Sequence, residues 1–317
     1  MNELELIQRL TRSLPANESV IAGAGDDCAV LDLGLPDRWL LFKTDAVVEG
    51  VHFDRSAAPE QIGRKALGRC LSDVAAMAGT PTAALITLAL PPDFNPKVVA
   101  GVYAGMAALA ERHRVAIVGG ETTTNPERLL ISIALLGTVA RDRCLFRSGA
   151  KAGDAIFVTG QLGGSRAGKH LEFTPRLAEA QWLAAHFKIH ALIDISDGLA
   201  GDLRHLLRAG RVGAELLTTS IPISRAARLR RRTESSRKTP LLAALTDGED
   251  FELLFTTASR DAVPLVDAWK GQFPKVPLTC IGKITAAPGL RLRNKEGTRE
   301  FTGGGYVHFD KSPAENS

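Results

Sequence analysis

A carboxylate stands on the apolar face of a helix that the sequence predicts over residues 59–79. Asp73 shares this face with Ala66, Cys70 and Met77, which recur at helical spacing. A buried, ionised carboxylate is costly unless a cation pairs with it. We therefore expect Asp73 to contact either a metal ion or an Arg or Lys side chain. A structural salt bridge or a backbone cap is the simpler alternative.

Further acidic residues stand at strand ends, in glycine turns or at the start of a helix. They are Asp26, Asp27, Asp45, Glu121, Asp194 and Asp197. Taken singly, each is typical of a turn residue or a helix N-cap. Strand ends and adjoining loops are also where α/β folds build their sites, so these carboxylates alternatively converge. Converging carboxylates require cations, and oxygen ligands without a His or Cys cluster favour Mg²⁺. A Mg²⁺ cluster in turn suggests a phosphorylated substrate such as ATP.

The commonest phosphate-binding loops are missing from the sequence. Residues 163–170 read GGSRAGKH, but His170 stands where a P-loop needs Ser or Thr for Mg²⁺. We expect a glycine-rich connection from a strand to a helix there. Residues 23–28 lack the third glycine of a dinucleotide-binding turn, and no HRD or DFG element of a protein kinase occurs.

Other polar features are candidate substrate contacts. Arg147 is suited to clamp phosphate oxygens, although a surface arginine is the simpler interpretation. His52 follows Asp45 closely, and it is either structural or in contact with a substrate group. The run GEDFE at 248–252 precedes a strand and either forms a turn or supplies a carboxylate to the substrate.

Strands and helices alternate along both halves, which predicts an α/β fold, with α/β or α+β layering. The 317 residues suit two domains, which we place at 1–139 and 140–317. Periodicity predicts helices over 1–10, 59–79, 96–113, 175–188 and 199–209, and the charged segment 225–239 is expected to be an exposed helix or loop. Strands are expected over 28–33, 39–43, 83–90, 115–118, 129–139, 155–159, 191–195, 251–256 and 278–284.

Composition restricts the class of protein. Apolar residues make up 45% and charged residues 23% of the chain, as in ordinary globular proteins. The net charge is only +4 and aromatic residues are 5%, so we expect no nucleic-acid partner. The four cysteines form no CxxC pair, which excludes a zinc ribbon. Neither a signal peptide nor an apolar stretch of ~20 residues occurs, so we expect a cytoplasmic protein with no membrane contact.

Seven motifs follow one another between about residues 4 and 309. They are GAGDDCA at 23–29, TD at 44–45 with EGVHF at 49–53, GRKAL at 63–67 with LSDVAAM at 71–77, GGETT at 119–123, RSGAK at 147–151, DISDGL at 194–199 and GEDFELLF at 248–255. In this combination the sequence resembles the thiamine-monophosphate kinase family. That family belongs to a superfamily with aminoimidazole ribonucleotide synthetase, selenophosphate synthetase and a hydrogenase maturation factor. The reactive N-terminal Cys or Sec loop of the selenophosphate enzyme is missing here.

The resemblance implies ATP-dependent phosphorylation of thiamine monophosphate to thiamine diphosphate, the last step of thiamine diphosphate biosynthesis. It implies a synthetase-like homodimer in which the N-terminal domain binds ATP and Mg²⁺ and pairs its sheet across the two-fold axis, while the C-terminal α/β domain covers the active-site cleft. By position, the implied Mg²⁺ ligands are Asp27, Thr44, Asp45, Asp73, Glu121, Asp194 and Asp197, among which Asp45, Asp73 and Asp197 are catalytic. The implied ATP contacts are Tyr103, Gly120, Arg147 and Ser196. The implied contacts to thiamine monophosphate are His52, Glu249 and Tyr306.

This sequence departs from the family pattern at a few positions. Glu121 stands where the family usually has Asp, Lys43 replaces a small residue that helps to bind a cation, and residues 246–247 replace small residues. A lysine at position 43 either replaces the charge of one cation or leaves its backbone carbonyl as a ligand. Two alternatives therefore stay open, namely another ATP-using enzyme of the superfamily and a degenerate protein that only binds thiamine phosphates.

Overall fold

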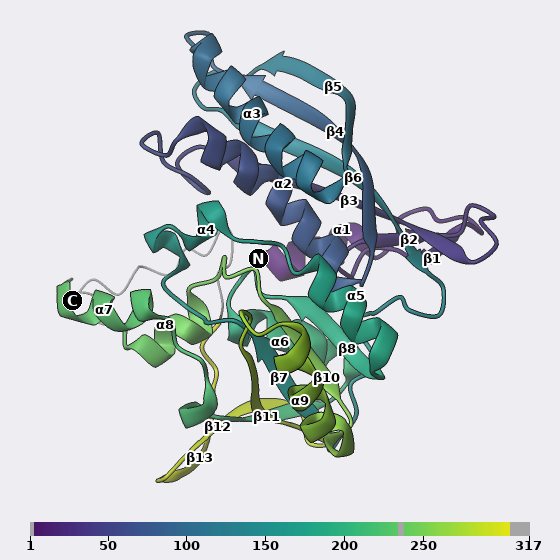
Figure 1. The fold of residues 1–317 in the computed structure, drawn as a ribbon, viewed down its shortest axis with the longest axis vertical. Helices are drawn as coiled ribbons and strands as arrows, with labels where there is room; N and C mark the ends of the chain where they lie inside the picture. The colour runs from purple at the N-terminus through teal and green to yellow at the C-terminus, as the bar shows by residue number, and fades with distance from the viewer. Residues whose placement is uncertain (1–2, 234–237, 305–317) are drawn as a thin grey trace.

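Two β-sheets with flanking helices organise the chain (Figure 1). The computed structural model describes residues 3–233 and 238–304. Within these ranges, the N-terminal sheet has six strands in the order β1-β2-β3-β6-β4-β5. The C-terminal sheet has seven strands in the order β13-β12-β9-β11-β7-β10-β8. The two sheets are separate, and helices lie between them.

The bounds of these elements follow the chain. The strands are β1 (Val20–Ala22), β2 (Ala29–Leu31), β3 (Arg38–Val48), β4 (Thr80–Leu90), β5 (Ala116–Thr124), β6 (Leu130–Ala140), β7 (Ala155–Thr159), β8 (Ile189–Asp194), β9 (Gly213–Leu217), β10 (Leu253–Thr257), β11 (Leu278–Thr285), β12 (Gly289–Asn294) and β13 (Gly297–Glu300). The helices are α1 (Glu3–Thr11), α2 (Pro59–Ala76), α3 (Pro96–His113), α4 (Lys169–Glu172), α5 (Leu177–His186), α6 (Leu199–Gly210), α7 (Arg225–Thr233), α8 (Pro240–Thr246) and α9 (Ala262–Gln272). Short 3₁₀ turns are η1 (Ser165–Ala167), η2 (Thr218–Ser220) and η3 (Ser259–Asp261).

The two faces of the N-terminal sheet differ. Helices α2 and α3 pack on one face, where Leu41 and Val47 of β3 are buried. Because side chains alternate along a strand, Phe42 and Thr44 point to the other face, where both are exposed. Leu85 of β4 is exposed on this second face as well. The sheet is thus covered on one side and open on the other within the described chain.

Helix α2 lies at the centre of the fold. Pro59 occupies its first turn, where a missing backbone N–H costs nothing. A Cβ atom at Gly63 would lie 1.9 Å from the carbonyl oxygen of Val102 in α3, so only glycine permits this close approach. Helix α2 also packs against α4, α5 and β8 of the C-terminal half. Nearly all of its residues are buried, and its polar side chains therefore face neighbouring elements rather than solvent.

The C-terminal sheet is buried on both faces along β7 and β10. Phe157 and Phe255 stack with ring centroids 5.4 Å apart and belong to the larger apolar core, which continues into the N-terminal half. The alternate residues Val158 and Leu254 belong to a second core that contains α6. This explains why both strands are continuous apolar runs in the sequence.

The predicted α/β fold with two sheets is confirmed. Strand β5 was expected to end at its glycine pair, but it continues to Thr124. A Cβ at Gly120 would lie 1.7 Å from the carbonyl oxygen of Ile86, so the glycine allows β5 to run beside β4 rather than ending it. Elements β9, α8, α9, β12 and β13 were not predicted, because their segments are short or interrupted by Pro and Gly.

The division at 139/140 stays a prediction. Strand β6 ends at Ala140, and the next strand belongs to the other sheet. The larger core nevertheless contains buried residues of both halves, so the junction is itself packed. Within the part of the chain that the structure describes, every helix is too short or too polar to span a membrane.

Candidate active site

Three buried carboxylates meet at the junction of the two halves. Asp27 precedes β2, Asp73 belongs to α2, and Asp194 is the last residue of β8. Oxygen atoms of the three side chains lie within 4.8 Å of one another. The side chains thus converge from segments that are far apart in the sequence, as the strand-end pattern predicted.

Each of the three carboxylates has a specific partner. The Arg147 guanidinium donates to Asp27 Oδ1 at 2.7 Å, and the Ser72 hydroxyl donates to Asp194 Oδ2 at 2.6 Å. The Lys43 ammonium lies 3.2 Å from Asp73 Oδ2. Among the described residues, the buried Asp27 Oδ2 has no hydrogen-bond partner. This oxygen fits a ligand set for a hard divalent cation, because an unsatisfied buried carboxylate oxygen is costly.

The cluster is unfavourable to full ionisation without added positive charge. Burial raises the pKa of Asp194 to about 7, and the neighbouring Asp27 charge adds to this effect. Burial also raises the pKa of Asp73 well above its usual value, although the Lys43 ammonium opposes the shift. A bound cation would favour the ionised forms, so the electrostatics and the donor set agree.

Asp45 lies beside this cluster, and Thr44 does not. Asp45 lies on the helix-covered face of β3, as Lys43 does, and its Oδ2 accepts from Arg69 Nε at 2.9 Å. The Thr44 hydroxyl lies on the opposite face, 3.5 Å from the hydroxyl of Ser132. Only the backbone of Thr44 is therefore directed toward the Asp45 side of the strand.

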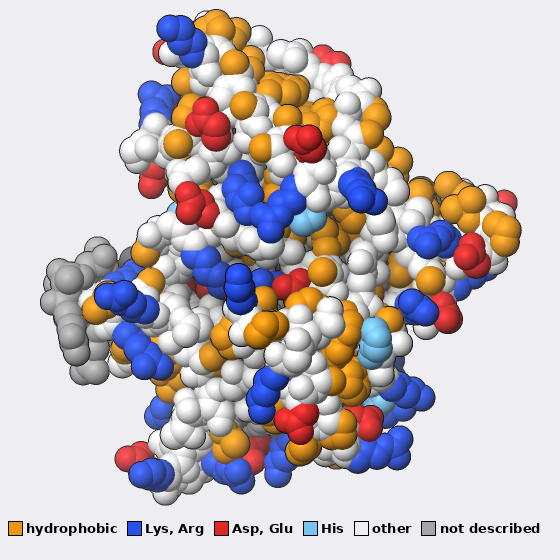
Figure 2. Space-filling model, in the orientation of Figure 1, with side chains coloured by type: hydrophobic (Ala, Val, Ile, Leu, Met, Phe, Trp, Pro, Cys, Tyr) orange, Lys and Arg blue, Asp and Glu red, His pale blue; other side chains and the backbone are white. Residues whose placement is uncertain are grey.

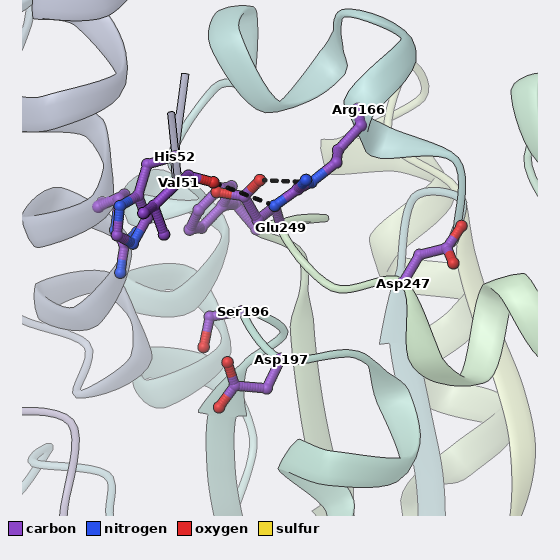
Figure 3. Close-up of a pocket in the computed structure, with 9 residues that line it drawn as sticks. Val51, His52, Arg166, Ser196, Asp197, Asp247 and Glu249 are labelled. Carbon is purple, nitrogen blue, oxygen red and sulfur yellow. Dashed lines mark hydrogen bonds and ion pairs between the residues drawn. The ribbon is translucent and has the colours of Figure 1, made fainter. Parts of the chain in front are cut away.

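A pocket adjoins the cluster. Its lining residues are Val51, His52, Arg69, Arg166, Ser196, Asp197, Asp247, Glu249 and Phe251. Figure 3 shows Arg166 pointing toward Glu249 and Val51, whereas the Asp247 carboxylate points away from them. Arg166 donates to the Val51 carbonyl at 3.2 Å and forms a 3.7 Å ion pair with Glu249. Four residues predicted for the site, namely His52, Ser196, Asp197 and Glu249, thus share one pocket.

Glu249 is held in an unusual loop. Its φ is +55°, and Gly248 and Phe251 also have positive φ. The Glu249 amide donates to the Ser196 carbonyl at 2.7 Å, which joins two segments of the pocket wall. Non-glycine residues in this conformation cost free energy and are concentrated at functional sites.

Lys65 connects the two halves below this pocket. Its side chain is fully buried, its Nζ lies 2.5 Å from Glu249 Oε1, and it donates to the carbonyl oxygen of His52. Burial lowers the pKa of Lys65 to about 8, and the Glu249 carboxylate only partly opposes this shift. One ammonium group therefore links a residue of the N-terminal half to a residue of the C-terminal half.

Helix α2 sets the length of the whole site. Lys65, Arg69, Ser72 and Asp73 lie on one face because they follow the helical period. At 1.5 Å per residue, about 12 Å separate the levels of Lys65 and Asp73 along the axis. The pocket and the acidic cluster are thus two ends of one site. On the face shown in Figure 2, Lys and Arg side chains gather at the level where the upper and lower parts meet.

Several predicted residues lie away from both ends. Tyr103 is exposed on α3, and Glu121 is exposed on the edge strand β5. Asp45 and Gly120 lie in one row across β3, β6, β4 and β5, because Ile133 and Ile86 connect their registers. Three strand spacings place them about 14 Å apart. Tyr306 lies outside the described residues.

Reasoning from the sequence missed several polar residues of the site, namely Lys65, Arg69, Ser72 and Arg166. Their helical spacing from Asp73 was a usable signal for the first three. The glycine-rich connection at 163–170 also needs a different explanation from phosphate binding. Lys169 Nζ lies 2.9 Å from Glu252 Oε1, and α4 has only four residues. The lysine thus contributes to an internal ion pair, as expected for a segment that is not a P-loop.

The chain is similar to known proteins along its whole length. Residues 25–139 match the family model of the AIR synthase related protein, N-terminal domain. The chain is 40% identical over 320 residues to the thiamine-monophosphate kinase of Rhodopirellula baltica, with 98% of each covered. It is 36% identical over 334 residues to the thiamine-monophosphate kinase of Escherichia coli, with 97% of this chain and 98% of that relative covered. It matches a solved structure of AaThiL complexed with AMPPCP and TMP at a TM-score of 0.80 and 31% identity, with 97% of both chains covered.

Proposed function

The chain belongs to the thiamine-monophosphate kinase family, and from this membership we infer that it phosphorylates thiamine monophosphate to thiamine diphosphate with ATP. The observation that carries the assignment to a place in the fold is the buried group of Asp27, Asp73 and Asp194 beside a pocket. We propose that the phosphates react at the acidic cluster and that the thiamine part lies toward the pocket.

The reaction joins two anions. An oxygen of the thiamine monophosphate phosphate forms a bond to the γ-phosphorus of ATP while the bond to the β,γ-bridging oxygen breaks, and ADP leaves with that electron pair. Positioning and charge neutralisation are the main requirements of such a transfer. Accordingly, the chain needs no covalent nucleophile of its own.

We propose Mg²⁺ as the resident cation, held by Asp27, Asp73 and Asp194 with Asp45, Thr44, Glu121 and Asp197 as further ligands. The unsatisfied Asp27 Oδ2 and the purely oxygen donor set support this choice. Bound Mg²⁺ would neutralise phosphate charge and fix the alignment of the reacting groups. Asp45, Asp73 and Asp197 are the proposed catalytic members of the set.

The remaining contacts are proposed from their positions. Arg147 lies at the cluster and is suited to phosphate oxygens, and Ser196 lines the pocket beside it. His52 Nδ1 accepts from the Val48 amide at 3.1 Å, so the neutral ring carries its proton on Nε2. This proton is a donor for thiamine monophosphate, and Glu249 supplies an acceptor. Tyr103, Gly120 and Tyr306 stay predicted contacts.

A homodimer would explain why some predicted residues lie far from the cluster of their own chain. Phe42 and Leu85 are exposed on the open face of the N-terminal sheet, and β5 is an edge strand. Gly120 and Glu121 belong to this same edge. We propose that a second copy covers the open face and that Glu121 acts at the cluster of that copy.

Mixing two inactive variants tests this arrangement. Chains with Asp73→Asn and chains with Glu121→Gln are each expected to lose activity, and their mixture regains part of it if Glu121 acts across the dimer. A monomer by light scattering, or no recovery on mixing, would contradict the proposal.

Product analysis tests the function itself. Purified protein with ATP, Mg²⁺ and thiamine monophosphate is expected to form thiamine diphosphate and ADP in equal amounts. Consumption of ATP without thiamine diphosphate would indicate another enzyme of the superfamily. Binding without consumption of ATP would indicate a degenerate binding protein. A cytoplasmic location stays a prediction.

A further inference from the structure

Lys43 is a positive charge placed among the carboxylates that are proposed to hold metal. Its Nζ lies 3.2 Å from Asp73 Oδ2, and its side chain is only 22% exposed. It projects from the same face of β3 as Asp45, between the buried Leu41 and Val47. The ammonium is therefore fixed at the cluster by the register of a central strand.

The carboxylates of this region differ in how their charge is balanced. Asp27 pairs with Arg147, and Asp45 pairs with Arg69. Asp194 accepts from the neutral Ser72 hydroxyl. These partners approach Asp27, Asp45 and Asp194, whereas Asp73 is balanced by Lys43.

An ammonium group is a suitable substitute for a metal ion at such a position. It is a compact point charge with three donors, whereas an arginine is a planar fork. Burial lowers the pKa of Lys43, but the charges of Asp73, Asp45 and Asp27 outweigh this and raise it. Lys43 therefore stays charged wherever the carboxylates are ionised.

We propose that the Lys43 ammonium takes the place of one divalent ion at Asp73, so that the cluster binds one ion fewer than it would without this lysine. The inference rests on the proposed function only in that it uses the same cluster. The second oxygen that requires a cation, Asp27 Oδ2, is still available to a divalent ion. A resident lysine also stabilises the buried carboxylates before any metal binds.

The test is a count of bound Mn²⁺ per chain, without nucleotide or thiamine monophosphate, from the signal of free Mn²⁺ in electron paramagnetic resonance. Lys43→Ser is expected to bind one more Mn²⁺ per chain than the wild type. Lys43→Arg keeps the charge and is expected to match the wild type. Lys283→Ser is a matched control, because Lys283 forms a 3.7 Å surface ion pair with Glu215 and is 57% exposed. An unchanged count for Lys43→Ser overturns the proposal.

A second readout covers a variant that is too unstable to count. Lys43→Met keeps the apolar stem and removes the charge. Its thermal midpoint in EDTA is expected to fall below that of the wild type, and Mg²⁺ is expected to raise the midpoint of this variant more than that of the wild type. Equal Mg²⁺ shifts in both proteins overturn the proposal.

The two proposals fail separately. A wild type that makes no thiamine diphosphate contradicts the proposed function and leaves the Mn²⁺ counts unchanged. Equal Mn²⁺ counts in an active enzyme contradict only the role of Lys43.

Discussion

The acidic end and the pocket end of the site each contain a lysine, and the two lysines respond to burial in opposite ways. At the acidic end, burial lowers the pKa of Lys43, but three carboxylates reverse this and raise it. At the pocket end, burial lowers the pKa of Lys65 to about 8. Glu249 opposes that shift, while the charges of Arg69 and Arg166 add to it.

The contrast shows which end lacks positive charge. The acidic end has more carboxylates than cations, so it retains its lysine charge and fits added divalent ions. The pocket end combines Glu249 with Lys65 and Arg166 and is close to internal balance. We therefore expect substitutions at the acidic end to affect turnover and substitutions at the pocket end to affect substrate binding.

The largest effect is expected from Asp73→Asn. Loss of this carboxylate removes a cation ligand and leaves Lys43 without its partner, so kcat is expected to fall at least about tenfold, or about 1.4 kcal/mol in the transition state. Asp267→Asn, at an exposed position on α9, is the control and should keep wild-type kinetics. Near-normal turnover of Asp73→Asn at saturating Mg²⁺ would remove Asp73 from the site.

Glu249→Gln is expected to act mainly on binding. The substitution removes the carboxylate that accepts from the substrate and pairs with Lys65, so KM for thiamine monophosphate is expected to rise about tenfold while kcat changes by less than about threefold. Steady-state kinetics with Glu296→Gln, on the exposed β12–β13 turn, as control measures this split. A fall in kcat with KM unchanged would place Glu249 at the acidic end instead.

These two carboxylates illustrate how much the sequence predicts. Asp73 was predictable because a charged residue on an apolar helical face must find a partner. The pairing of Lys65 with Glu249 was not, because it depends on the docking of α2 against a loop of the C-terminal half. The opposite directions of Thr44 and Asp45 follow from strand alternation once β3 is known to continue through them.

The pocket end is expected to respond to alkaline pH, because the pKa of Lys65 is about 8. Below this pH the ammonium pairs with Glu249, and above it the neutral amine leaves the carboxylate unbalanced. KM for thiamine monophosphate is therefore expected to rise about twofold to fivefold between pH 7 and pH 9 in the wild type, within the range of one charged contact.

Lys65→Met removes the titrating group, so its KM is expected to be high and independent of pH over this range. Lys270→Met, at an exposed position, should keep the wild-type profile. A Lys65→Met profile that still bends near pH 8 would assign the titration to another group.

The smallest effect is expected from Arg166→Ala. Its side chain is 62% exposed, and its ion pair with Glu249 is long, at 3.7 Å. Exposed pairs of this kind contribute ~0–1 kcal/mol, so KM is expected to rise about twofold to threefold. A change above about tenfold would show that Arg166 contacts the substrate directly.

The central claim is that Asp27, Asp73 and Asp194 form the divalent-cation site of the kinase. Diffraction from crystals grown with Mn²⁺ and AMPPCP, recorded at the manganese absorption edge, tests it directly. The account predicts an anomalous peak at ligand distance, about 2.2 Å, from oxygen atoms of all three carboxylates. Anomalous peaks only at other places, with these three side chains turned away from any ion, would contradict it.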